Sequence, residues 1–236
     1  MPGETEEQHT GPGRLAFHRR IDEVARRSGA IRAFEELYGA HPEGALLRGP
    51  AGHAVVPSGR RPDADDVLPE PLRGCGLTIV RDPVAAPEQA GSDDADALAA
   101  LVWLRLGLSR ALLDACLGYL EQRTVHGAPL LRQQLVGGAL ADAVTEQTEV
   151  ESVLLAPVHG PAALGDLHHQ ISAVDRRLLR LLGAFGFTAE GPGRTALLSE
   201  LIADVYSCHR HAEPSELSEP SEPSEPSEPA QPEAVQ

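Results

Sequence analysis

From Asp94 to Tyr206 the chain alternates long stretches of helical hydrophobic periodicity with short connectors rich in glycine and proline. Apolar residues recur every three or four positions, which predicts one buried face on each stretch. Aromatic residues make up 3% of the chain and hydrophobic residues 42%, so a core must consist mainly of Leu, Ala and Val. Because Leu and Ala favour helices, we expect a mostly α fold.

Four helices are expected in this part of the chain. Their expected ranges are 94–122, 129–155, 164–182 and 195–206. Pro129 would occupy the first turn of the second helix, where a missing N–H does no harm. Gly183 would stop the third helix. Helices with short connections run antiparallel, so the pattern predicts an up-down four-helix bundle over 94–207.

The residues before the bundle have a different composition. Residues 1–13 are polar and contain Gly and Pro, which predicts disorder. Residues 14–93 are predicted to form a small helical and irregular region. Helical spacing covers 14–39, with a break at Ser28-Gly29. Three short apolar runs suggest strands at 45–47, 54–56 and 77–80.

The segment 208–236 repeats Ser-Glu-Pro from Ser215 and is predicted to be a disordered, extended chain. It is interpreted as a solvating spacer, or alternatively as a docking or phosphorylation segment. From Glu213 onward it holds seven Glu and no Lys or Arg, which leaves about −8 of the total charge of −15 for the rest. This charge argues against nucleic acid as a partner.

The cysteines indicate a reducing compartment. Cys75, Cys116 and Cys208 are an odd number and form no C-x-x-C pair, so we expect a cytoplasmic protein. The longest apolar run, Ala97–Leu104, is too short to span a membrane. The first residues also lack the cationic and apolar regions of a secretory signal.

The most specific motif runs from Tyr119 to Asp142 and reads YLEQRTVHGAPLLRQQLVGGALAD. It resembles the signature of the C-terminal helical domain of acyl-CoA dehydrogenases, Y-x-x-x-R-x-x-F-G-x-P-L-x-x-F-Q-x-x-x-x-x-L-A-D. The positions that match without a gap are Tyr119, Arg123, Gly127, Pro129, Leu130, Gln134, Leu140, Ala141 and Asp142. The two Phe of the signature are His126 and Gln133 here. The resemblance covers about residues 95–206 and implies FAD as the cofactor.

The resemblance also implies cofactor-binding residues. In the family, the Arg at the position of Arg123 reaches the FAD diphosphate of a neighbouring subunit, which suits a planar, permanently charged guanidinium. Gln134 matches a residue that contacts the flavin nucleotide, and His126 replaces an aromatic ring near the adenine. A second family motif, Q-x-x-G-G-x-G-Y, appears at 180–187 as RLLGAFGF, in which Gly183 allows close backbone approach.

The same residues also have plain structural readings. Arg123 could cap a helix C-terminus, Gln134 could lie on a solvated face, and Gly183 could be a helix stop.

The residue that should act as catalytic base is missing. Most family members carry Glu after the last helix of the bundle, and Ser207 stands in its place. Serine by itself has no useful basicity. Other members place the base on the first helix of the bundle, where this chain has Ala97. The nearby Asp93, Asp94 and Asp96 are interpreted as helix caps, so no catalytic residue is assigned.

The resemblance implies a flavin oxidoreductase that oxidises a CH–CH bond of an acyl thioester. Fewer than a hundred residues precede the bundle, too few for the two other domains of the family, so 14–93 is interpreted as a middle-domain remnant. We expect a degenerate subunit that forms homo- or hetero-oligomers through the bundle, including with a full-length acyl-CoA dehydrogenase. Its substrate would be acyl-CoA or a carrier-bound acyl thioester. The alternative is a non-catalytic dimerisation or interaction protein derived from that family.

Two histidine-containing groups have residue types that occur in binding sites. Cys208-His209-Arg210-His211 has metal-ligand residue types but lacks the second pair that a zinc site needs, so no metal site is predicted. His168 and His169 are adjacent and cannot share one helix face, so both are predicted to be surface residues.

Overall fold

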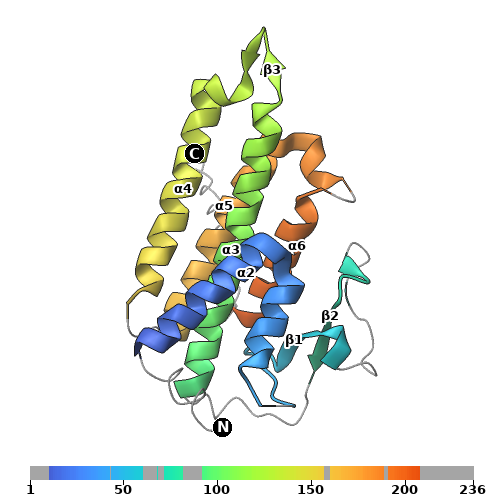
Figure 1. Cartoon of the computed structure of the whole chain (residues 1–236), viewed down its shortest axis with the longest axis vertical. Coiled ribbons are helices and arrows are strands. Elements are labelled where there is room, and N and C mark those ends of the chain that lie inside the picture. The colour runs from blue at the N-terminus through green and yellow to red at the C-terminus, as the bar shows by residue number, and fades with distance from the viewer. Residues whose placement is uncertain are drawn as a thin grey trace, which may run out of the picture.

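The computed structural model describes residues 11–42, 44–60, 68, 72–81, 92–156, 160–188 and 191–207. The described structure is mostly α-helical, as predicted (Figure 1). The predicted disorder of 1–10 and 208–236 lies outside the described residues. Residues 11–13, also predicted to be disordered, instead begin the first helix.

The predicted up-down bundle is present. Its helices are α3 (Ser92–Glu121), α4 (Gln134–Leu154), α5 (Pro161–Leu182) and α6 (Gly193–Tyr206). Successive helices run in opposite directions in Figure 1. Gly183 ends α5 with φ 54°, as predicted, since glycine tolerates a positive φ. No helix in the described ranges is both long enough and apolar enough to cross a bilayer.

The connection between α3 and α4 differs from the prediction. Thr124–Val125 (β3) and Ala128–Pro129 (β4) form a short antiparallel hairpin, followed by the 3-10 turn η3 (Leu130–Arg132). His126 and Gly127 form its tip with φ 51° and 79°, the pair of positive φ values that a tight hairpin turn requires. Pro129 therefore belongs to a strand and does not open α4, which begins at Gln134.

Before the bundle lies α2 (Gly11–Gly39), which is kinked as predicted. Gly29 has φ 80° and ψ −179°, so the helix turns there into two arms (Figure 1). The first arm crosses α3 at a point of close backbone approach. A Cβ atom added at Gly107 of α3 would lie 2.2 Å from the Asp22 carbonyl oxygen and 2.8 Å from the Ala25 Cβ. The crossing therefore requires glycine at position 107.

Ion pairs fasten the first arm of α2 to the bundle. The Arg110 guanidinium of α3 donates to Asp22 at 2.7 Å and to Glu151 of α4 at 2.5 Å. Arg26 donates two hydrogen bonds to Asp114, at 2.7 and 2.9 Å. Asp96, expected to be a helix cap, instead lies inside α3 and accepts a hydrogen bond from Arg14 at 2.8 Å.

A two-stranded antiparallel sheet covers one end of α6. It consists of β1 (His53–Pro57) and β2 (Leu77–Arg81), with Val55 opposite Ile79. The 3-10 turn η1 (Ser58–Arg60) directly follows β1 in the chain. Two of the three predicted strands are thus present. The third, at 45–47, is an irregular segment, in which the Leu47 amide bonds the Tyr38 hydroxyl at 3.4 Å instead of a strand partner.

The sheet and α6 are joined by buried tyrosines. The Tyr206 hydroxyl accepts a hydrogen bond from the Val55 amide at 2.9 Å, and the Tyr38 hydroxyl donates to the Val55 carbonyl at 3.0 Å. A Cβ atom at Gly49 would lie 1.7 Å from the Val205 carbonyl oxygen, so the loop before β1 touches the last turn of α6. The region 44–57 therefore closes this end of the bundle.

The hydrophobic core has three clusters. One joins α2, both strands, the first half of α3 and α6; it includes Phe34, Leu37, Leu104 and Ile202. A second, at the hairpin end of the bundle, includes Leu112, Leu120, Val174 and Leu178. A third surrounds Trp103 between α3, α4 and α5. The first cluster shows that the N-terminal region shares one core with the bundle.

The Gly107 crossing predicts a selective loss of stability. Gly107→Ala should lower the free energy of unfolding by about 1–3 kcal/mol, because the new methyl group meets backbone that cannot move aside cheaply. Gly118→Ala is the matched control in the same helix, since a Cβ there meets nothing within 4 Å. That variant should be neutral or stabilising by up to about 1 kcal/mol, as expected from helix propensity. Urea unfolding of both variants measures the difference; equal stabilities would contradict the close approach.

Candidate functional site

The candidate site lies at the end of the bundle that carries the β3–β4 hairpin. We call it the hairpin end; it comprises the hairpin, η3, the first turns of α4 and α6, the last turn of α5 and the following 3-10 turn η4 (Gly183–Phe187) (Figure 1). The structure brings all four predicted cofactor-binding residues, Arg123, Gln134, His126 and Gly183, to this end. All four are exposed.

Arg123 has the most organised surroundings of the four. The Tyr119 ring lies parallel to the Phe185 ring, with centroids 4.5 Å apart and an interplanar angle of 2°. The Arg123 guanidinium carbon lies 4.7 Å from the Tyr119 ring centroid, a cation–π distance. Within the described part of the chain, no carboxylate forms an ion pair with Arg123. The guanidinium of Arg123 is therefore held in place over an aromatic ring.

A hollow of about 490 Å³ lies beside this stack. Its lining residues are Ala115, Gly118, Tyr119, Gln122, Arg123, Phe185 and Pro192. The lining combines small and aromatic side chains with one permanent positive charge, which suits an anionic group attached to a flat ring. Phe185 was not expected to take part, because only its position in the glycine-rich turn was visible in the sequence.

The other three predicted residues lie outside this lining. Gln134 is the first residue of α4, where no side chain caps the free amide groups. His126 is at the hairpin tip, and Gly183 ends α5. The structure thus gathers the predicted residues at one end, and places Arg123 alone of the four at the hollow.

The position of the missing base is buried. The Ser207 side chain is 4% exposed, and its hydroxyl donates to the Ala203 carbonyl at 2.6 Å. Its neighbour Tyr206 is held beneath β1 by the bond to Val55. Asp96, near the alternative position of the base, is engaged by Arg14. Neither position therefore offers a free carboxylate in the described residues.

A polar layer that the sequence analysis missed crosses the centre of the bundle. Arg105 of α3 is 0% exposed, and each of its three guanidinium nitrogens donates a hydrogen bond. It donates to Ser199 Oγ of α6 at 3.1 Å, and to the His168 carbonyl and Ser172 Oγ of α5 at 2.7 and 2.9 Å. A further bond reaches His168 Nδ1 at 3.1 Å. Three helices therefore meet on one cation.

His168 is buried, so its prediction as a surface residue was wrong, whereas His169 is exposed. Arg105 can only donate, so His168 Nδ1 must accept and the ring must be neutral. Burial and the neighbouring Arg105 charge lower the pKa of His168 to about 3. Burial also lowers the pKa of Arg105 to about 10, which still leaves it charged at neutral pH.

Asp175 of α5 completes the layer. Its Oδ2 accepts a hydrogen bond from Ser199 at 3.0 Å, while no described group bonds its Oδ1. Burial raises the pKa of Asp175 to about 6, although Ser109, Arg105 and Ser199 act in the opposite direction. Nearby, Gln147 of α4 donates to Ser109 of α3 at 2.9 Å. The only sequence signal for this layer was the presence of Arg105 and Asp175 on otherwise apolar helix stripes.

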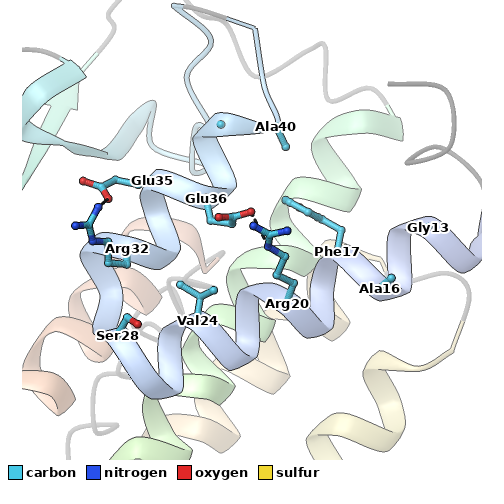
Figure 2. A pocket seen from close by; sticks show the side chains of 11 residues that line it. Gly13, Ala16, Phe17, Arg20, Val24, Ser28, Arg32, Glu35, Glu36 and Ala40 are labelled. Carbon is cyan, nitrogen blue, oxygen red and sulfur yellow. Dashed lines mark hydrogen bonds and ion pairs between the residues drawn. The ribbon is translucent and has the colours of Figure 1, made fainter. Parts of the chain in front are cut away.

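A second hollow, of about 740 Å³, lies between the two arms of α2 (Figure 2). Phe17 and Val24 of the first arm contribute apolar surface to it. Figure 2 shows that its charges satisfy one another, since Arg20 pairs with Glu36 at 2.8 Å and Arg32 with Glu35 at 2.7 Å. We assign no ligand to it.

Metal binding finds no support in the described ranges, which contain no group of three or more His, Cys, Asp or Glu able to hold a metal ion. The segment Cys208–His211 lies outside the described residues.

No protein-family model matches the sequence, and no curated protein matches it. Among solved structures, the chain is similar to one described as FkbI for biosynthesis of the methoxymalonyl extender unit of the polyketide immunosuppressant Fk520. The identity is 22%, over 64% of this chain and 47% of that chain, with a TM-score of 0.43. This chain thus spans about half of that protein. A likeness at this level assigns no function.

The Asp175 carboxyl predicts a specific pH dependence. Its pKa is raised on folding, so its contribution to stability is full below its ordinary pKa and is lost as pH rises through about 6. Asp175→Asn removes this loss of stability, because an amide does not ionise as the pH rises. The variant should therefore gain on the order of 1–3 kcal/mol relative to the wild type between pH 4 and pH 7. His168 is present in both proteins and cancels in the difference, which urea unfolding at each pH measures. A difference that does not change with pH would contradict the burial of this carboxyl.

Ser207→Glu tests whether the position of the missing base can hold a carboxylate. It should destabilise the fold by about 2 kcal/mol or more, because it buries a charge and removes the bond to Ala203. Ser152→Glu is the matched control, since Ser152 is exposed and its hydroxyl also donates to its own helix, to Thr148 at 2.8 Å. The control should change stability by less than about 0.5 kcal/mol. Thermal unfolding compares the two, and equal effects would mean that position 207 is accessible.

Proposed function

We propose that the protein is an FAD-associated subunit of an oxidoreductase that acts on acyl thioesters, and that its hairpin end contributes Arg123 to the FAD diphosphate. The observation that carries the proposal is the unpaired Arg123 guanidinium, stacked on Tyr119 beside the hollow. It occurs at the position where the acyl-CoA dehydrogenase signature has its diphosphate-binding Arg.

The chemistry of the residues present fits this cofactor. A diphosphate needs charge-assisted donors, which a guanidinium supplies as a fork of N–H groups. The parallel rings of Tyr119 and Phe185 offer a flat apolar surface next to that charge. The hollow is open to solvent, which fits a cofactor shared with a second subunit. When bound, FAD would supply the hydride acceptor, while this chain would bind and orient its phosphates.

A partner subunit would have to supply the catalytic base. Ser207 is buried and its hydroxyl donates a hydrogen bond to the Ala203 carbonyl, so it offers no group to remove a substrate proton. The partner would be a second copy or a fuller acyl-CoA dehydrogenase, with acyl-CoA or a carrier-bound acyl thioester as substrate. Large exposed apolar side chains at the hairpin end, Leu135 and Phe187, support a subunit contact there. The buried free thiols of Cys75 and Cys116 fit a cytoplasmic location.

A second candidate is a non-catalytic interaction protein that uses the same bundle. The burial of Ser207 and the closure of that end of the bundle by residues 44–57 favour it. The two candidates differ in whether Arg123 still binds a nucleotide diphosphate.

Titration with FAD, followed by the quenching of flavin fluorescence, tests the proposal. Arg123→Ala should weaken binding about 10- to 100-fold, the loss expected for one charge-assisted contact. The FAD affinity of Arg123→Lys should lie between those of the wild type and Arg123→Ala, because an ammonium keeps the charge but not the fork of N–H donors. Arg19→Ala removes an exposed arginine outside the hairpin end and should leave the Kd unchanged. Wild-type protein that binds no FAD, alone or mixed with an acyl-CoA dehydrogenase, would favour the interaction protein.

A further inference from the structure

Two sets of arginines in the described structure differ in their carboxylate partners. Eight arginines of the helices form ion pairs with carboxylates: Arg14, Arg20, Arg26, Arg27, Arg32, Arg110, Arg176 and Arg177. Four others gather at the hairpin end: Arg123 after α3, Arg132 in η3, Arg180 in the last turn of α5 and Arg194 in the first turn of α6. None of these four forms an ion pair in the described ranges. Outside both sets, Arg105 is buried, and Arg19, Arg60 and Arg81 form no ion pair in the described part of the chain but lie away from the hairpin end.

Few of the described carboxylates lie at this end. Glu121 is the last residue of α3, and Asp142 lies two turns into α4. Glu146, one turn further, is already paired with Arg177 at 2.6 Å. The hairpin end is therefore a cationic patch on a chain whose total charge is −15.

The same end also exposes apolar surface. The Leu135 side chain is 88% exposed and Phe187 is 74% exposed. Val125 of β3 and Phe185 are also partly exposed there. Unpaired cations next to exposed apolar side chains indicate a surface that is covered by a binding partner.

The acidic segment 208–236 of the same chain has the matching composition. Seven Glu lie between Glu213 and Glu233, interleaved with proline and with no Lys or Arg. A glutamate every third residue of an extended proline-rich chain places carboxylates about 9 Å apart. Such spacing can reach arginines that project from separate elements, as these four do.

The segment is long enough to reach the patch. It follows Ser207, beyond the last residue of α6, at the opposite end of the bundle from the hairpin. The bundle helices are roughly 20 to 45 Å long, from 14 residues in α6 to 30 in α3. Twenty-nine residues of extended chain span up to about 90 Å. Glu222 lies 15 residues past Ser207, about 46 Å of extended chain, so the glutamates from Glu222 to Glu233 fall within range of the hairpin end.

We infer that the acidic segment 208–236 docks on the cationic hairpin end of its own bundle, with its glutamates against Arg123, Arg132, Arg180 and Arg194. Covalent attachment supplies an effective concentration in the millimolar range, so several weak contacts suffice. The contacts are solvent-exposed, and salt must weaken them. If Arg123 also binds a diphosphate, the segment competes with it; that consequence rests on the proposed function, whereas the docking itself does not.

A nitroxide on the segment tests the docking. Ser224→Cys in a Cys208→Ser background gives one accessible thiol, since Cys75 and Cys116 are buried. In the full chain at low salt and without any flavin, amide NMR signals of the hairpin end should lose most of their intensity. Those of the β1–β2 sheet should not. Raising the salt to about 1 M should restore the signals, because the Debye length falls to about 3 Å.

Two charge-matched variants locate the contact. Arg180→Gln with Arg194→Gln should release the segment and restore the signals at low salt. Arg19→Gln with Arg81→Gln changes the net charge equally, at exposed positions away from the hairpin end, and should leave the broadening in place. The inference would be overturned if the amide signals of the hairpin end were not broadened, or if the broadening lay elsewhere in the protein. It would also be overturned if both variants changed the broadening equally. Because no flavin is present, a failure to bind FAD would leave this result unaffected.

Discussion

A guanidinium without access to water must have its donors satisfied, and Arg105 imposes this requirement on the bundle. Its bonds to Ser199, Ser172 and His168 join α3 to α5 and α6 at one level of the core. Loss of any partner would leave a buried N–H donor unsatisfied, so the relative placement of these helices is strongly constrained. The apolar clusters on either side of this layer impose no such directional requirement, because apolar contacts are non-directional whereas hydrogen bonds need a fixed geometry.

The two ends of the bundle on either side of this polar layer differ in character. At one end, α5 and α3 are aligned so that Phe185 lies flat on Tyr119, and Arg123 is left stacked and unpaired. At the other, the last turn of α6 is inserted beneath β1, where Tyr206 bonds the strand. One end is open and cationic, and the other is closed by the chain itself.

This asymmetry defines what the chain can contribute chemically. Its open end presents the guanidinium of Arg123, a fork of N–H donors whose geometry suits an anionic group. Its closed end buries Ser207, which offers no accessible group there. If the chain acts as the proposed oxidoreductase subunit, catalysis would be divided between it and a partner that supplies the base.

The sequence by itself determined the mostly helical bundle, the kink at Gly29, the end of α5 at Gly183 and two of three strands. Each follows from local periodicity or from the conformational freedom of glycine. It did not reveal the hairpin at Pro129, the burial of His168 or the ion pair of Asp96, since these depend on partners distant in the sequence. Only the tertiary structure revealed that the Phe185 ring stacks on the Tyr119 ring and that Arg105 bonds Ser199. The packing of the helices decides which of their faces are in contact, and the sequence of each helix alone does not specify this.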